Sequence, residues 1–95
     1  MTRRAWQEVR AKRLRTPAAR DAYWQAARAF RIGEEVRRLR EERGWSQREL
    51  AERMGATQSV IARLEAGGVV PTIATLDRVA AALGVELDIH FAESA

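Results

Sequence analysis

The sequence lacks cysteine altogether and contains one histidine, His90. Disulfide bonds, thiolate chemistry and cysteine-based zinc sites are therefore excluded, and a lone histidine offers no second ligand or base. The chain also contains no glycine-rich phosphate loop and no metal-ligand spacing. These absences argue against an enzyme, a bound metal and a cofactor.

Long apolar runs are missing too. Every uninterrupted apolar stretch is far shorter than the roughly 20 residues that span a membrane, and no signal-peptide core follows the basic N-terminus. We therefore expect a soluble, cytoplasmic protein that has no membrane contact. A chain of 95 residues makes one small domain with a marginal core, so a second copy that adds buried surface would stabilise it.

Lysine is nearly absent, since Lys12 is the sole example among 17 basic residues. Residues 1–43 carry 13 basic and 6 acidic side chains, a net charge of +7, whereas residues 44–95 carry 4 and 7, a net charge of −3. Arginine favours bidentate contacts with phosphate or carboxylate groups. Charge alone is equally consistent with a nucleic-acid partner and with a solvated helical surface.

The first half of the chain has helical periodicity. A short helix is expected over residues 3–14, and Thr16-Pro17, a capping residue followed by proline, is typical of a new helix start. From there apolar residues recur through Phe30 toward Glu42 at steps of three and four. This pattern predicts either one long helix or two helices with a break near Gly33.

The middle of the chain predicts two short helices joined by a tight turn. Gly44 suits the end of the preceding helix, Ser46–Glu49 has the spacing of a capping box, and Gly55 interrupts the next helix. Thr57 can cap a further helix, which ends before Gly67-Gly68. A helix, a glycine turn and a second helix of this length form a helix-turn-helix unit.

The second of these helices has two different sides. At about 100° per residue, Val60, Ile61 and Leu64 fall together on a side that we predict to be buried. The other side carries Gln58, Ser59, Ala62, Arg63 and Ala66. Glutamine can pair with the edge of adenine and arginine with that of guanine, so this side suits the major groove of DNA. The alternative is an exposed helix face that is merely solvated.

The end of the chain changes its period. Pro71-Thr72 opens a last helix, which Gly84 closes, and residues 85–91 then alternate apolar and polar side chains as a β-strand does. A single strand leaves its backbone donors and acceptors unpaired, so we predict that it pairs with its own copy across a two-fold axis. The predicted contact residues of this homodimer are Leu87, Ile89 and Phe91.

From Val36 to about Gly84 the chain resembles the Cro and phage-repressor type (Xre family) of helix-turn-helix proteins. The resemblance covers about half of the chain. The matching positions are Arg40, Gly44, Ser46, Gln47, Glu49, Leu50, Ala51, Gly55, Ser59, Ile61, Leu64, Glu65, Gly67, Pro71, Thr75, Leu76, Ala82, Leu83 and Gly84. The resemblance implies a bundle of short helices that binds double-stranded operator DNA as a dimeric transcriptional repressor.

The resemblance also implies which side chains contact DNA. They are Arg43, Gln47, Thr57, Gln58, Ser59, Ala62 and Arg63. Gln47 and Thr57 match positions that contact phosphates, whereas the polar residues that follow Thr57 match positions that read bases. Ala62 departs from the polar residue often found at its position, which reduces the number of direct base contacts.

One further pair of positions is structural by the same resemblance. Arg40 and Glu65 match a semi-buried ion pair that ties the preceding helix to the end of the base-reading helix. Arg40 or its neighbour Arg43 can also face the DNA backbone.

The layout of the whole chain is similar to that of HigA-type antitoxins. A basic helical extension, the motif and a short C-terminal strand follow one another, and segments such as Tyr23-Trp24 and Ala26–Arg28 support the likeness. This second resemblance implies an antitoxin that neutralises a RelE-fold ribonuclease toxin and represses its own operon. The alternative is a stand-alone Xre-type regulator with no toxin partner.

The extension holds the candidates for binding a protein partner. They are Trp6, Arg10, Arg13, Tyr23 and Trp24. Aromatic and arginine side chains are enriched at interface hot spots. Trp6 and Trp24 can instead pack one N-terminal helix against another, and the arginines can contact phosphate, an acidic patch or only water.

The predicted architecture is an all-α, lambda-repressor-like helix-turn-helix bundle with one C-terminal β-strand. It comprises an N-terminal helical extension (residues 1–32), a DNA-binding domain (residues 33–84) and a dimerisation strand with a tail (residues 85–95). The expected function is operator-specific repression by a homodimer associated with the nucleoid.

Overall fold

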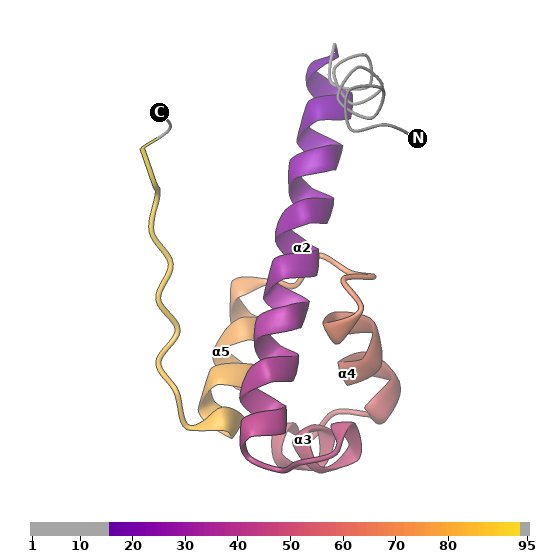
Figure 1. Ribbon diagram of the computed structural model, residues 1–95, viewed down its shortest axis with the longest axis vertical. Helices are drawn as coiled ribbons and strands as arrows, with labels where there is room; N and C mark the ends of the chain where they lie inside the picture. Colours follow the sequence, from indigo (N-terminus) through magenta and orange to yellow (C-terminus); the bar gives the residue numbers. More distant parts are fainter. Residues whose placement is uncertain (1–15, 94–95) are drawn as a thin grey trace.

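The computed structural model describes residues 16–93, and Figure 1 shows them as a group of helices followed by an extended segment. The helices are α2 (Pro17–Glu42), α3 (Gln47–Met54), α4 (Gln58–Glu65) and α5 (Ile73–Leu83). The predicted all-α class is confirmed, and none of the helices between residues 16 and 93 is long and apolar enough to cross a membrane. The helix predicted over residues 3–14 lies outside the described residues, as do Trp6, Arg10 and Arg13.

α2 is one continuous helix of 26 residues, which decides between the two predicted arrangements. The Thr16 hydroxyl accepts a hydrogen bond from the backbone N–H of Ala19 at 3.1 Å, and Pro17 takes the first helical position. The proposed boundary between extension and domain, at residue 33, falls inside this single helix. The N-terminal half of α2 projects well beyond the other helices (Figure 1).

Gly33 lies inside α2 because α4 approaches it backbone to backbone. A Cβ atom at this position would lie 2.5 Å from the carbonyl oxygens of both Leu64 and Glu65. Glycine in a helix costs about 1 kcal/mol of stability relative to alanine. The contact between α2 and α4, which only glycine permits at this distance, offsets that cost. The buried stripe of α2 therefore includes Gly33, while Phe30 is 54% exposed.

Side-chain caps start the three short helices at the predicted places. The hydroxyls of Ser46, Thr57 and Thr72 accept hydrogen bonds from the backbone N–H three residues later, at 3.1, 3.3 and 3.1 Å. Gly55 ends α3 with a φ of 68°, a left-handed conformation that glycine adopts without steric cost. These local signals fix the short turn between α3 and α4.

The core lies where all four described helices meet. Its fully buried side chains are Leu50, Ile61 and Leu64, around which Val36, Val79 and Leu83 pack. The prediction that Val60 is buried was wrong, since this residue is 39% exposed. Ile61 points directly at the core, and a rotation of about 100° per residue carries Val60 onto the edge of α4.

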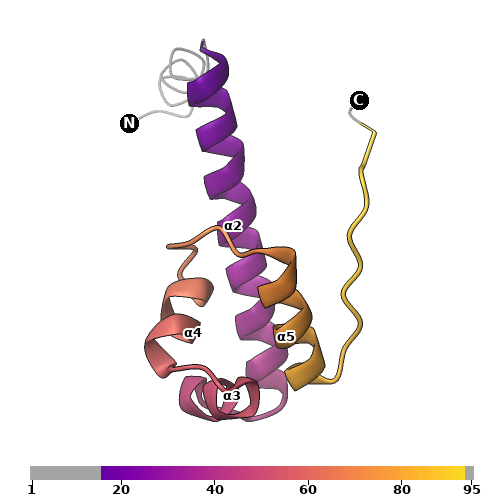
Figure 2. The same cartoon turned by 180° about the vertical axis from the view of Figure 1, so that it is seen from behind.

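The predicted β-strand over residues 85–91 was wrong. This segment is extended, but no strand occurs among residues 16–93. A strand requires a second strand as its backbone hydrogen-bond partner, and the described part of one chain offers none. Figures 1 and 2 show the segment on the same side of α2 as α5 and set apart from the helices. Val85 packs against the core and Leu87 is half-buried, whereas Ile89 and Phe91 are exposed.

Candidate nucleic-acid interface

α4 presents a polar face on the side opposite to the core. Its buried residues are Ile61, Leu64 and Glu65. Its exposed polar residues are Gln58, Ser59 and Arg63, next to the half-buried Ala62 and the exposed cap residue Thr57. The structure thus brings five of the predicted DNA-contacting residues together on one helix and its cap.

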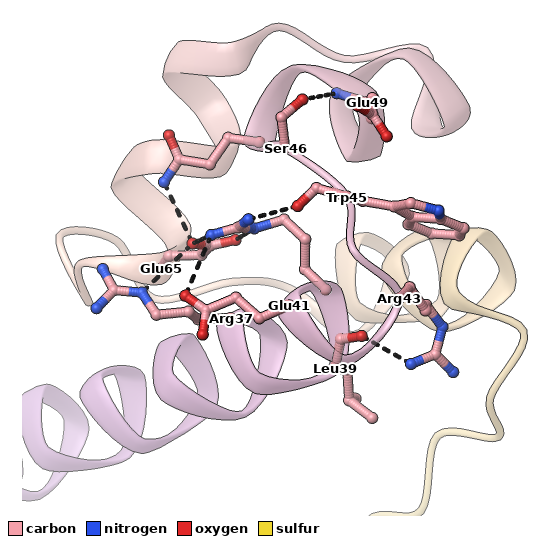
Figure 3. A network of polar contacts seen from close by, with 10 residues as sticks. Arg37, Leu39, Glu41, Arg43, Trp45, Ser46, Glu49 and Glu65 are labelled. Carbon is pink, nitrogen blue, oxygen red and sulfur yellow. Dashed lines mark hydrogen bonds and ion pairs between the residues drawn. The ribbon is translucent and has the colours of Figure 1, made fainter.

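Arg40 and Glu65 form a bidentate ion pair beneath this face. Nε and Nη2 of Arg40 donate to the two carboxylate oxygens of Glu65 at 2.7 and 2.9 Å, and Nη1 donates to the carbonyl of Trp45 at 2.7 Å (Figure 3). Only 9% of Arg40 and 3% of Glu65 are exposed. The pair therefore ties α2 to the end of α4 and to the loop that precedes α3.

Both members of this pair remain charged. Burial by itself would raise the pKa of Glu65, but hydrogen bonds from Arg40 and Gln47, together with the charges of Arg40 and Arg37, hold it below its ordinary value. The hydrogen bond to Glu65 in turn raises the pKa of Arg40. No buried side-chain nitrogen or oxygen within residues 16–93 is left without a hydrogen-bond partner. The charges are therefore compatible with their burial.

Gln47 joins this network from the first turn of α3. Its Nε2 atom donates a hydrogen bond to Oε1 of Glu65 at 3.2 Å. This contact holds the half-buried side chain of Gln47 at the N-terminal end of α3. The contact links the predicted phosphate-contacting position to the ion pair. Sequence reasoning placed Gln47 and Glu65 correctly on their helices but did not anticipate this hydrogen bond between them.

Arg43 has a different environment from the other predicted DNA contacts. Its Nε and Nη1 atoms donate to the carbonyls of Leu83 and Leu39 at 2.9 and 2.7 Å, so the side chain joins the C-terminal ends of α5 and α2. Figure 3 shows Arg43 and Glu65 on opposite sides of the network. The structure therefore does not bring Arg43 together with the polar face of α4.

Two more arginines are engaged within the bundle. Arg78 lies on α5, and its Nη2 atom donates a hydrogen bond at 2.7 Å to the carbonyl of Met54, the last residue of α3. This bond caps the C-terminal end of α3. The guanidinium of Arg53 lies 3.9 Å from the centre of the Trp45 ring, in a cation–π contact. Neither role had a local sequence signal, because both depend on how the helices pack.

Two aromatic candidates of the extension, Tyr23 and Trp24, lie in the N-terminal half of α2. Tyr23 and Trp24 sit on the projecting half of α2, with their ring centres 5.0 Å apart and their planes at 82°. This edge-to-face arrangement is a favourable aromatic contact. The structure therefore places Tyr23 and Trp24 on a different helix from the polar face of α4.

Comparison with known proteins agrees with this geometry. The helix-turn-helix family matches residues 36–90, more than half of the chain. This chain belongs to the helix-turn-helix family. The predicted resemblance to helix-turn-helix proteins is thereby confirmed, and α3 and α4 are the two helices of the motif.

Two helix-turn-helix relatives are similar to the same part of the chain. One is an uncharacterised HTH-type transcriptional regulator of Methanothermobacter thermautotrophicus, 45% identical over 51 residues, which are 54% of this chain and 74% of the relative. The other is an uncharacterised HTH-type transcriptional regulator of Sinorhizobium fredii, 43% identical over 54 residues, which are 57% of this chain and 70% of the relative. No solved structure matches the chain.

Proposed function

We propose that this chain is a sequence-specific DNA-binding transcriptional regulator that reads its operator through α4. The observation that carries the proposal is the division of α4 into a buried apolar side and an exposed polar side within a helix-turn-helix motif. Gln58, Ser59 and Arg63 read base edges in the major groove, and Ala62 permits close approach. The relatives named as transcriptional regulators support this function.

Residues at the ends of the motif helices hold the DNA backbone in this proposal. Gln47 stands at the start of α3, where Glu65 orients its amide, and Thr57 stands at the start of α4. Contacts with phosphates position a protein on the duplex without selecting a sequence. The ion pair between Arg40 and Glu65 acts indirectly, because it fixes α4 relative to α2.

The regulator acts as a homodimer. A single bidentate base contact contributes only about 1–3 kcal/mol of discrimination, so one short helix cannot select an operator from a genome. Two recognition helices about 34 Å apart can enter successive major grooves of a palindromic site. The site of action is then the nucleoid, in the cytoplasm.

Selection from a pool of random-sequence duplexes tests the proposed function directly. The wild-type protein should enrich a palindromic sequence. Arg63→Ala should then cost about 1–3 kcal/mol and relax the preference at one base pair, whereas Gln47→Ala should weaken binding to all sequences alike. Failure to enrich any sequence would contradict the proposal, and identical effects of the two variants would contradict the division of roles.

A second candidate function is that of an antitoxin, which also represses its own operon. The projecting half of α2 favours it, because this half carries the Tyr23–Trp24 pair beyond the DNA-binding bundle, and aromatic side chains are enriched at interface hot spots. The partner of such an antitoxin is a RelE-fold ribonuclease toxin. The stand-alone regulator without a toxin is the competing proposal.

Co-purification from the native host distinguishes these two proposals. An antitoxin should bring down a small toxin in a fixed ratio, and Trp24→Ala should weaken that complex while operator binding is unchanged. A chain that purifies alone and still binds its operator would be a stand-alone regulator.

A further inference from the structure

We propose that Val60 of α4 contacts the C5 methyl group of a thymine in the operator, at the base pair next to the one that Arg63 reads. The inference deepens the proposed function, on which it rests, because it assigns a base preference to an apolar side chain. Val60 was predicted to be buried, but it lies at the edge of α4 and is 39% exposed. Within residues 16–93, neither the buried core nor the partly buried residues packed against it include Val60.

The exposed valine lies among residues that we propose to contact DNA. At about 100° per residue, Thr57 and Arg63 each lie about 60° from Val60 around the helix axis, on the preceding and the following turn. The backbone N–H of Val60 donates to the Thr57 hydroxyl at 3.3 Å, so the valine belongs to the capped first turn of α4. The helix end assigned to DNA therefore includes one apolar side chain.

The major groove offers a single kind of apolar group to such a side chain. Base pairs present hydrogen-bond donors and acceptors there, and thymine adds its C5 methyl group. Against any other base edge the valine would cover polar groups that it cannot pair. A β-branched side chain in a helix has one strongly preferred χ1 angle, so Val60 loses little conformational freedom on contact. Thymine is therefore the base that this side chain fits.

The position of Val60 on α4 indicates which thymine it contacts. The three residues from Val60 to Arg63 advance by about 4.5 Å along the helix axis, close to the spacing of about 3.4 Å between successive base pairs. Gln58 lies about 160° from Val60 around the axis, at the opposite edge of the exposed face. The thymine is therefore next to the guanine that Arg63 reads, and away from the base that Gln58 reads.

The contact selects a methyl group and not a hydrogen-bonding pattern. 5-Methylcytosine carries this group at the same ring position as thymine, whereas cytosine and deoxyuridine lack it. A duplex with cytosine in place of this thymine should therefore bind more tightly once that cytosine is methylated at C5. The affinity of the regulator for such a site then depends on the methylation of the DNA.

Deoxyuridine scanning of the operator obtained by duplex selection tests the contact. Each thymine is replaced in turn by deoxyuridine in both half-sites, and the dissociation constant of the full chain is measured. One replacement should weaken wild-type binding about fourfold per half-site, the effect of one buried methyl group. It should lie next to the base pair at which Arg63→Ala relaxes the preference. Val60→Ala should abolish the loss, whereas Val60→Ile should retain it.

Val69→Ala is the matched control, because Val69 is 40% exposed but lies in the loop that follows α4. This variant should keep the wild-type ratio between the affinities for the thymine and deoxyuridine duplexes. At the same position, the wild type should prefer 5-methylcytosine to cytosine about fourfold per half-site, and Val60→Ala should not. Circular dichroism should show that all the variants remain helical.

The possible failures are distinguishable. A selected operator without any methyl-dependent position, or with the same dependence in Val60→Ala, would overturn the contact and leave the DNA-binding function standing. A Val60-dependent position away from the Arg63 base pair would overturn the proposed register. Failure to select any operator would overturn the DNA-binding function and the contact together.

Discussion

The helical bundle and the C-terminal segment differ in the kinds of side chain that they bury and expose. The bundle buries Arg40 and Glu65, whereas the segment exposes Ile89 and Phe91. Two conditions explain the difference. The buried charges are fully hydrogen-bonded by elements of the same chain, and the exposed apolar residues have no covering element within residues 16–93. Burial in this protein therefore follows the available partners rather than residue type alone.

The largest effect should come from removing one member of the buried ion pair. Glu65→Ala leaves the buried guanidinium of Arg40 without its bidentate carboxylate partner, which should lower the free energy of unfolding by about 3–5 kcal/mol. Glu42→Ala is the control, because Glu42 pairs with Arg38 on the exposed side of α2 and should contribute less than about 1 kcal/mol. Urea unfolding followed by circular dichroism measures both. Equal losses would show that the buried pair has no special importance.

A smaller loss should follow from filling the close crossing of α2 and α4. Gly33→Ala places a Cβ atom 2.5 Å from two carbonyl oxygens, so the helices must separate and stability should fall by about 1–3 kcal/mol. Gly68→Ala meets its nearest atom at 3.5 Å and should change stability far less. Thermal unfolding of the two variants makes the comparison. Stabilisation by Gly33→Ala would show that helix propensity outweighs the contact.

Acid should weaken the bundle through Glu65. Its pKa in the folded chain lies below the ordinary value of 4.5, so its stabilising contribution is complete above that pH and is lost as the pH falls through the folded-state pKa. Unfolding free energies measured from neutral pH downward should therefore decline only under acidic conditions. Glu65→Gln should be less stable at neutral pH and should show a shallower acid decline. An unchanged acid decline would assign the dependence to other carboxylates.

The smallest effect should come from a substitution in the C-terminal segment. Ile89→Ser should change the free energy of unfolding by less than about 0.5 kcal/mol, because Ile89 lies on the surface of the described chain. Val79→Ala, in the core, should cost considerably more. A large loss from Ile89→Ser would mean that the segment packs against its own bundle.

Local signals were sufficient to predict much of the fold. Thr16, Ser46, Thr57 and Thr72 cap helices at the expected places, since a cap depends on residues only three positions apart. Gly55 marks the turn for a similar reason. The polar residues of α4 were assigned to its exposed face from helical periodicity alone.

Contacts between segments that are distant in the sequence could not be predicted from hydrophobic periodicity. Propensity alone allowed a helix break at Gly33, yet the burial of this residue depends on the last turn of α4, which contains Leu64 and Glu65. Arg43 was predicted to contact DNA, but its guanidinium donates to backbone carbonyls at the ends of α5 and α2. Only the tertiary fold brings these two helix ends together. The strand prediction failed because alternation reports an extended chain and not the presence of a pairing partner.

Because α2 is continuous, the directions in which side chains point at its two ends are fixed relative to each other. Each residue of an α-helix turns by about 100° and advances by about 1.5 Å, so the direction in which Trp24 points is set by the direction in which Arg40 points. Inserting one residue between them would swing the projecting end through more than a quarter of a turn, whereas inserting four would nearly restore its direction. A protein held by the projecting end would therefore keep a fixed angle to the helix that we propose reads DNA.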